Sequence, residues 1–221
     1  MKKTIIAALV PLCVLFFTSC KKGGSNQPVV PPSADSYLPV TASSNWTYSD
    51  VISGTKDTIR LTMTGATTNI GGQTFYTASG KSRINPVITE NYYSGNHLYI
   101  RQYSIGGGVY QTYISVTLLN DTVAAGNSFT ASITPDGTLA GSPARIVNTV
   151  IEKNISKVVN GVTFSNVIHT HVDLQYNYGA GFATNSTYDY YLAKGVGIIE
   201  EDLGSAGSTD ETKTLMNYSV K

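Results

Sequence analysis

The stretch Val158-Val159-Asn160-Gly161-Val162-Thr163-Phe164 places an Asn-Gly pair between two runs of β-forming residues. Asn and Gly tolerate positive φ angles, and a type I′ turn requires positive φ at both of its central positions. An Asn-Gly pair in this setting is typical of a tight β-hairpin. The stretch therefore predicts two antiparallel strands that meet at residues 160 and 161.

Apolar and polar residues alternate along other parts of the chain as well. In Thr58–Thr64, the side chains of Ile59, Leu61 and Met63 share one face, and polar side chains share the other. Strands with one dry and one wet face are typical of antiparallel sheets, because buried parallel strands are apolar throughout. The sequence therefore predicts an all-β domain. Two further strands support this prediction, with apolar faces made by Tyr110, Ile114, Val116 and Leu118, and by Ile168, Val172, Leu174 and Tyr176.

The composition is polar but weakly charged. Charged residues make up 13% of the chain, which is about half of the usual share. The chain contains 15 Lys and Arg against 14 Asp and Glu, whereas a nucleic-acid-binding protein needs a basic face. We therefore expect no nucleic-acid partner. The abundance of Thr, Ser, Asn, Gly and Tyr suits an exported β-protein.

The N-terminus has the order of a secretory signal. Lys2 and Lys3 precede an apolar run, Ile5–Phe17, which is shorter than the roughly 20 residues of a membrane-spanning helix. Basic residues, a short apolar run and small residues before a cleavage site describe a signal peptide. We therefore interpret residues 1–19 as a signal peptide.

Cys20 follows this run directly. The segment Phe17-Thr18-Ser19-Cys20 resembles the cleavage site of bacterial lipoproteins, although Phe17 stands where an aliphatic residue is usual. The resemblance implies that Cys20 becomes the first residue of the mature protein and carries acyl chains, such as palmitate, that enter a membrane. One alternative is a secreted protein that is cut near the same place. The other is a disulfide between Cys13 and Cys20, which requires both residues to survive processing.

Residues 20–36 are interpreted as a flexible tether that begins with the lipidated Cys20. They contain Pro28, Pro31 and Pro32 together with Gly, Ser and Asn, and they lack hydrophobic periodicity. A segment of this kind does not bury enough apolar surface to fold. The remaining residues, 37–221, have a length that suits a single domain.

Three short stretches of this domain carry a family resemblance. They are Tyr37-Leu38-Pro39-Val40 followed by Asn45-Trp46-Thr47-Tyr48, Leu118-Leu119 followed by Ala125-Gly126-Asn127-Ser128-Phe129, and the run from Tyr190 to Ile199. These stretches are similar to motifs of Bacteroidota envelope lipoproteins of unknown function, including the TapB-like group, although Ser44 stands where Gly is common. The resemblance implies a curved antiparallel sheet. Its form would be a half-barrel, similar to the LolA and LolB lipoprotein carriers, or a sandwich.

His169, His171 and Asp173 form the most site-like constellation in the sequence. Alternate residues of a strand point to the same face, so two imidazoles and a carboxylate would lie together. Such a set could hold zinc with one position open for water. The same residues also fit the wet face of a half-buried strand. We expect no metal and no other cofactor, and keep these three residues as the candidate ligands.

Catalytic motifs are weak, and we predict no catalytic residue and no enzymatic activity. Glycoside hydrolysis needs two facing carboxylates, and the spacing of Glu90, Glu152 and Asp189 does not pair them. The cluster Glu200-Glu201-Asp202 is interpreted as a solvated end of a strand. The 15 tyrosines are interpreted mainly as packing residues, because Tyr favours strands.

Two short motifs concern modification. Asp57-Thr58-Ile59 and Asp121-Thr122-Val123 resemble the O-glycosylation motif of exported Bacteroidota proteins. The resemblance implies glycans at Thr58 and Thr122 if the source belongs to that group.

The sequence thus predicts a non-enzymatic lipoprotein of the cell envelope that is held at the cell membrane or outer membrane by its lipid. Its sheet is expected to bind a protein partner or an apolar ligand, such as an acyl chain. The first alternative is a carbohydrate- or surface-binding module that uses exposed tyrosines. The second is an envelope hydrolase with convergent carboxylates.

Overall fold

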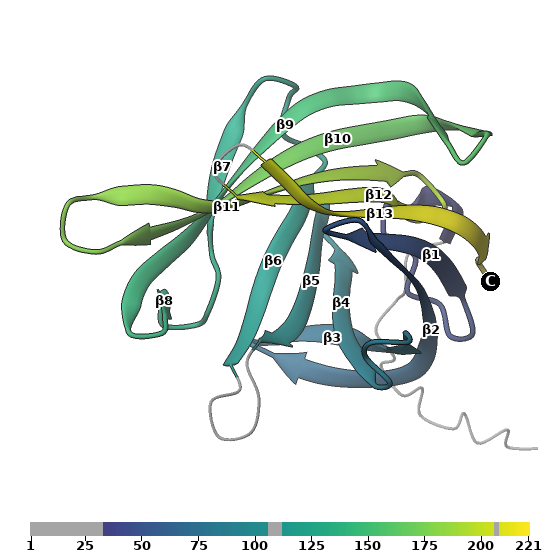
Figure 1. Ribbon diagram of the computed structural model, residues 1–221, viewed down its shortest axis with the longest axis horizontal. Helices are drawn as coiled ribbons and strands as arrows, with labels where there is room; N and C mark the ends of the chain where they lie inside the picture. Colours follow the sequence, from purple (N-terminus) through teal and green to yellow (C-terminus); the bar gives the residue numbers. More distant parts are fainter. Residues whose placement is uncertain (1–32, 106–111, 206–207) are drawn as a thin grey trace, which may run out of the picture.

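The computed structural model describes residues 33–105, 112–205 and 208–221 of the chain, and it is almost entirely β-structure (Figure 1). The signal peptide, Cys20 and most of the tether lie outside the described residues. No helix among the described residues is long and apolar enough to cross a membrane. The elements are the 3-10 helix η1 (Ser33–Asp35) and the strands β1 (Asn45–Ile52), β2 (Thr55–Ile70), β3 (Gln73–Lys81), β4 (Ile88–Gly95), β5 (Leu98–Ile105), β6 (Thr112–Asn120), β7 (Ser128–Ser132), β8 (Thr138–Leu139), β9 (Ser142–Val159), β10 (Val162–Asn177), β11 (Phe182–Ala193), β12 (Gly197–Ser205) and β13 (Ser208–Ser219).

All described strands belong to one antiparallel system. The main path runs in the order β6-β5-β4-β3-β2-β1-β13-β12-β11-β10-β9-β7, and β8 pairs with β9 beside it. The sheet curls until β6 and β9 approach each other, so it is nearly closed into a barrel (Figure 1). The prediction of a single curved antiparallel sheet is confirmed, and the sandwich alternative is wrong.

The local patterns explain this sheet. Asn160 and Gly161 have φ angles of 48° and 79°, so the turn between β9 and β10 has the two positive φ values of the predicted hairpin. Leu61 and Met63 are buried, whereas their neighbours Thr62 and Thr64 are exposed. Period-two alternation therefore aims the apolar face of each strand into the barrel.

Buried side chains, rather than a strand ladder, hold β6 against the opposite wall. The Nδ2 atom of Asn148 on β9 donates to the carbonyl oxygens of Thr117 and Leu118, each at 2.9 Å. The hydroxyl of Thr170 on β10 donates to the same Leu118 oxygen at 2.8 Å. Both side chains are fully buried. They satisfy carbonyl groups of β6 inside the protein, where unpaired polar groups are costly.

Replacing Asn148 by alanine should therefore weaken the closure. We expect the free energy of unfolding to fall by about 1–3 kcal/mol, because the Thr117 carbonyl loses its side-chain donor and the Leu118 carbonyl keeps only Thr170. Urea denaturation measures this change, with Asn185→Ala on the exposed part of β11 as the matched control. Equal stability of the two variants would show that Asn148 does not hold the barrel closed.

The residues before β1 close one end of the barrel. Tyr37, Leu38 and Val40 are buried there, and the backbone N–H of Gly195 donates to the Ser36 carbonyl at 2.8 Å. Gly195 has a positive φ of 76° and lies 3.3 Å, measured from an ideal Cβ position, from the Ala34 backbone. The tight β11–β12 turn thus allows this close approach, and we call this region the plug end.

Strand β1 runs from the plug end to the opposite end of the barrel. At its start, the indole Nε1 of Trp46 donates to the carbonyl of Val196 at 2.7 Å. Asp50 and Ile52, near its other terminus, line a hollow between β1, β5, β12 and β13. We call this second region the mouth. The first described residues, Ser33–Ser36, therefore lie at the plug end, away from the mouth.

Candidate functional site

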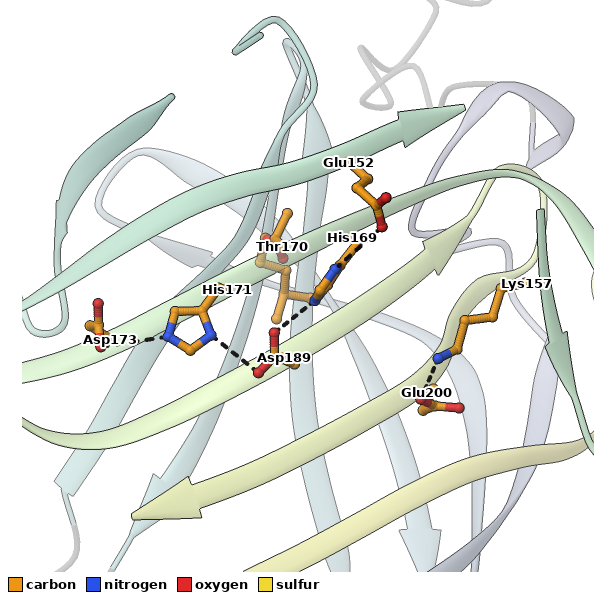
Figure 2. Close-up of polar contacts among 9 residues, drawn as sticks. Glu152, Lys157, His169, Thr170, His171, Asp173, Asp189 and Glu200 are labelled. Atoms are coloured by element: carbon orange, nitrogen blue, oxygen red, sulfur yellow. Dashed lines mark hydrogen bonds and ion pairs between the residues drawn. The ribbon is translucent and has the colours of Figure 1, made fainter. Parts of the chain in front are cut away.

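The predicted constellation on β10 lies on the outer face of the barrel (Figure 2). Nε2 of His169 lies 2.7 Å from one carboxylate oxygen of Asp189, and Nδ1 of His171 lies 3.1 Å from the other. Asp173 is farther away, with its Oδ1 3.7 Å from Nε2 of His171. The His169 ring also stacks on Tyr191, with 4.2 Å between the ring centroids. Asp189, on the neighbouring strand β11, therefore bridges the two imidazoles.

This arrangement is a set of hydrogen bonds between imidazoles and a carboxylate, and each becomes an ion pair when its imidazole is protonated. Asp189 raises the pKa of His171 through its hydrogen bond, although partial burial opposes the shift. Burial opposes ionisation of Asp189 as well, but His169 and His171 outweigh it and lower the pKa of that carboxyl. In residues 33–105, 112–205 and 208–221, no group of three or more His, Cys, Asp or Glu side chains is placed to hold a metal ion. The geometry therefore supports charge pairing on the wet face.

Removing the bridging carboxylate should lower the pKa of His171. In Asp189→Asn, the charged partner that favours the imidazolium is lost, so we expect the midpoint of the His171 titration to move to lower pH. A raised pKa in the folded state contributes stability that is present at low pH and is lost as the pH rises through it. The wild type should therefore exceed Asp189→Asn in melting temperature by more at pH 5.5 than at pH 8.5. NMR titration of the ring protons measures the pKa, and an unchanged midpoint would contradict this pairing.

A second group of chemically active side chains lies at the mouth. They surround a cleft of about 470 Å³, which we call the mouth cleft. Strands far apart in the sequence contribute to it, because the barrel brings β1, β4, β5, β12 and β13 together there. The lining contains four carboxylates, two cationic groups and two tyrosines, namely Asp50, Glu90, Glu201 and Glu211, Arg101 and Lys213, and Tyr103 and Tyr188.

A buried ion pair forms the floor of the mouth cleft. The guanidinium of Arg101 donates to both carboxylate oxygens of Glu201, at 2.6 and 2.9 Å. Both side chains are at most 7% exposed. Arg101 also donates to the Tyr190 hydroxyl at 3.1 Å, and Lys213 lies 3.6 Å from Glu201. Burial alone would raise the pKa of Glu201, but Arg101 and Lys213 lower it to about 2, so this carboxylate is charged at neutral pH.

Two buried polar atoms of the same cleft have no hydrogen-bond partner in the structure. They are Oδ1 of Asp50, an acceptor when it is ionised, and Nε of Arg101, a donor. Burial raises the pKa of Asp50 to about 6, Glu211 beside it adds to the shift, and Lys213 opposes it. Unpaired buried polar atoms are rare in folded proteins. Two of them at one cleft indicate a place where a ligand or solvent supplies the missing bonds.

Sequence reasoning missed this site and misjudged one of its residues. Glu201 was expected in a solvated strand end, but it is 5% exposed and belongs to the ion pair. Ile199 and Leu203, two residues before and after Glu201, point to the same side of β12. Because both are apolar, the alternation along the strand already indicated that Glu201 faces the interior. Of the carboxylates proposed for a hydrolase, Glu90 lines the mouth cleft, whereas Glu152 and Asp189 lie on the outer face near His169.

Comparisons with known proteins show the fold. No protein-family model matches the chain, and no curated protein matches it. A proposed exported protein with a YmcC-like fold from Bacteroides fragilis is similar in structure, with a TM-score of 0.50 and 7% sequence identity over 84% of this chain and 99% of that one. The barrel has a YmcC-like fold.

A proposed lipoprotein from Parabacteroides distasonis is also similar, with a TM-score of 0.49 and 8% identity, covering 84% of this chain and 99% of that one. The finer resemblances to the TapB-like group and to the LolA and LolB carriers stay predictions.

The remaining predicted sites fall into two groups. Thr58 on β2 and Thr122 after β6 are both exposed, and a glycan at either residue stays a prediction. Cys20 lies outside the described residues, so its lipidation also stays a prediction.

Proposed function

We propose that the chain is a lipid-anchored protein of the cell envelope whose mouth cleft binds a small, hydroxyl-rich ligand without transforming it. The proposed anchor is Cys20, the first residue after the predicted signal peptide. The similarity in fold to a proposed exported protein supports placement outside the cytoplasm. The barrel then presents its mouth cleft on the side away from the tether.

The unpartnered atoms of Asp50 and Arg101 carry this proposal. A carbohydrate hydroxyl both donates and accepts hydrogen bonds, so neighbouring hydroxyls of one sugar could satisfy an acceptor and a donor together. The volume of about 470 Å³ falls in the range of small-molecule sites, about 300–1,000 Å³. Tyr103 and Tyr188 offer aromatic walls beside the polar groups. These features support the carbohydrate-binding alternative among the functions predicted from the sequence.

The apolar interior gives less support to an acyl-chain ligand. The apolar hollow between Trp46, Met63 and Ile198 has a volume of about 20 Å³, close to the space that one water molecule needs. An acyl chain would require the core around it to open. The polar mouth cleft accepts a ligand without that cost.

Asp50→Asn should raise the stability of the free protein and weaken ligand binding. A raised pKa means that ionised Asp50 destabilises the free protein as the pH rises through about 6. The amide removes that charge, so we expect a higher melting temperature than wild type at pH 8 and a smaller difference at pH 4. Ligand affinity should fall about 10-fold or more, because a charged acceptor is lost.

The experiment titrates neutral sugars and amino sugars, as mono- and disaccharides, into wild type, Asp50→Asn and the control Asp173→Asn by calorimetry at pH 7.5. Asp173 lies on the outer face, so its variant should bind like wild type. Binding that Asp50→Asn and Asp173→Asn reduce equally, or not at all, would contradict a ligand in the mouth cleft.

A hydrolase is the second candidate, because acidic groups with opposite pKa shifts line the same cleft. Asp50 is poised as an acid with a pKa of about 6, and Glu201 is ionised; pairs of this kind carry acid–base catalysis. Incubation of the same sugars with the protein, followed by chromatography, distinguishes the two functions. Unchanged sugars support binding alone, and products that disappear in Asp50→Asn would establish hydrolysis.

A further inference from the structure

We propose that the plug end of the barrel rests on the lipid surface. The contacting surface consists of Val158 and Val162 in the β9–β10 hairpin and Met216 and Tyr218 on β13, and we call it the apolar tip. This inference depends on the lipid anchor of the proposed function. It goes further because it assigns a membrane-contacting surface to the folded domain itself.

The side chains of the apolar tip are exposed. Its side chains are 63%, 52%, 56% and 41% exposed for Val158, Val162, Met216 and Tyr218, respectively.

Two contacts join the hairpin to β13. Nδ2 of Asn160 donates to the Leu215 carbonyl at 2.8 Å, and the rings of Phe164 and Tyr218 are 6.2 Å apart between centroids. Large apolar side chains gathered at one place on a surface indicate an interaction site.

This surface lies where the tether joins the barrel. Tyr218 is paired with Trp46 in the β13–β1 ladder, and the Trp46 indole donates to Val196. The next residue back, Gly195, is bonded to Ser36. The tip of the β9–β10 hairpin and the C-terminus both lie at the right of Figure 1, whereas the β10–β11 hairpin projects to the left.

The length of the chain before the described residues selects a bilayer as the occupant. Only residues 21–32 separate Cys20 from Ser33, and a chain of this length spans at most about 45 Å when fully extended. The anchor therefore keeps the plug end within about 45 Å of the lipid that holds Cys20, a distance that allows direct contact.

The chemistry of the apolar tip suits this surface. Tyr is enriched at membrane interfaces, and apolar side chains beside cations favour interfacial binding. Lys194, which is exposed and pairs with Asp35 at 3.4 Å, supplies a basic group at this end.

Site-directed fluorescence quenching tests the contact. The full lipidated chain with Val162→Cys carries a bimane label, and a second chain carries the label at Val87→Cys, which is 80% exposed beside the mouth cleft. Both are reconstituted in phosphatidylethanolamine–phosphatidylglycerol vesicles that contain lipids with nitroxide-labelled head groups. We expect quenching at position 162 to exceed quenching at position 87 several-fold. Val158→Asp with Met216→Asp should reduce quenching at 162 toward the value at 87.

Flotation of the vesicles on a density gradient separates the two possible failures. Chains that float with the vesicles but are quenched equally at 162 and 87 would overturn the docked plug end and leave the anchor intact. Chains that do not float would overturn the lipid anchor and this inference with it. Circular dichroism confirms that the substituted chains keep their β-structure, which is expected because the replaced side chains are exposed.

Discussion

Arg101→Met is expected to lower the free energy of unfolding by about 3–5 kcal/mol, because it leaves the Glu201 carboxylate buried without its main partner. Both side chains are almost completely buried, and two short hydrogen bonds join them. The total stability of a domain is about 5–15 kcal/mol, so this variant should be close to unfolding at ambient temperature. Urea denaturation of wild type and variant at pH 7 measures the loss.

A double-mutant cycle separates the ion pair from the packing around it. Glu201→Leu alone should also destabilise the barrel, because it leaves the Arg101 guanidinium unpaired. The double variant Arg101→Met/Glu201→Leu removes both charges. We expect its loss of unfolding free energy to be about 2–3 kcal/mol smaller than the sum of the two single losses. Additive losses would show that the two charges do not act as a pair.

The same pair sets how the protein responds to acid. Glu201 has a folded-state pKa of about 2, against an ordinary value of 4.5. A lowered pKa contributes stability that is present above the unfolded-state value and is lost as the pH falls through the folded-state value. The wild type should therefore lose stability between about pH 4.5 and pH 2, and the double variant should lose less over this interval.

Cys20→Ala is expected to release the mature protein from membranes almost completely. The acyl chains on Cys20 are the proposed anchor, and at least two hydrophobic signals are needed for stable attachment. Without them, the apolar tip alone supplies only a weak, reversible contact. Membrane and soluble fractions of cells that express the tagged chain, compared by immunoblot, measure the release.

Two controls test whether the release from the membrane is due to the loss of Cys20 alone. Cys13→Ala changes the other cysteine of the chain, and the product should stay in the membrane fraction. The barrel of Cys20→Ala should melt at the wild-type temperature, because the described domain begins at Ser33. Continued membrane association of Cys20→Ala would contradict the lipid anchor.

Much of the fold could be predicted because local chemistry decides it. The Asn160-Gly161 turn requires positive φ, and the structure has it at both residues. The alternation predicted in Thr58–Thr64 is also present, with Leu61 and Met63 buried and Thr62 and Thr64 exposed. Each of these features depends on residues that are neighbours in the sequence.

The mouth cleft could not be predicted in this way because its members come from distant strands. Arg101 and Glu201 lie 100 residues apart in the sequence, and the strand order that joins them follows from how the sheet closes. The alternation of inward and outward side chains along a single strand nevertheless gave an indication of the site. Asp50 shares its face of β1 with buried Trp46 and Tyr48, so a charged group was present on an inward face. Such a position indicates either a buried pair or a site.

The His169–His171 pattern shows that the position of a residue within its strand predicts its face but not its partner. Strand geometry correctly placed both imidazoles on one face, but Asp189 from the next strand became their shared partner. Register between strands, which depends on the whole sheet, decided that contact. Asp173 was close in sequence and contributes a longer contact of 3.7 Å.

The central claim is that a hydroxyl-rich ligand completes the hydrogen bonds of the mouth cleft, and the Nε–H signal of Arg101 reports on it directly. Titration of the neutral and amino sugars into ¹⁵N-labelled protein should shift this signal progressively to saturation, because the ligand pairs a donor that has no partner in the free structure. The Asp50→Asn chain should need about 10-fold more of the same sugar. A signal that stays unshifted with every sugar up to about 10 mM, a limit that corresponds to negligible affinity, would contradict the claim.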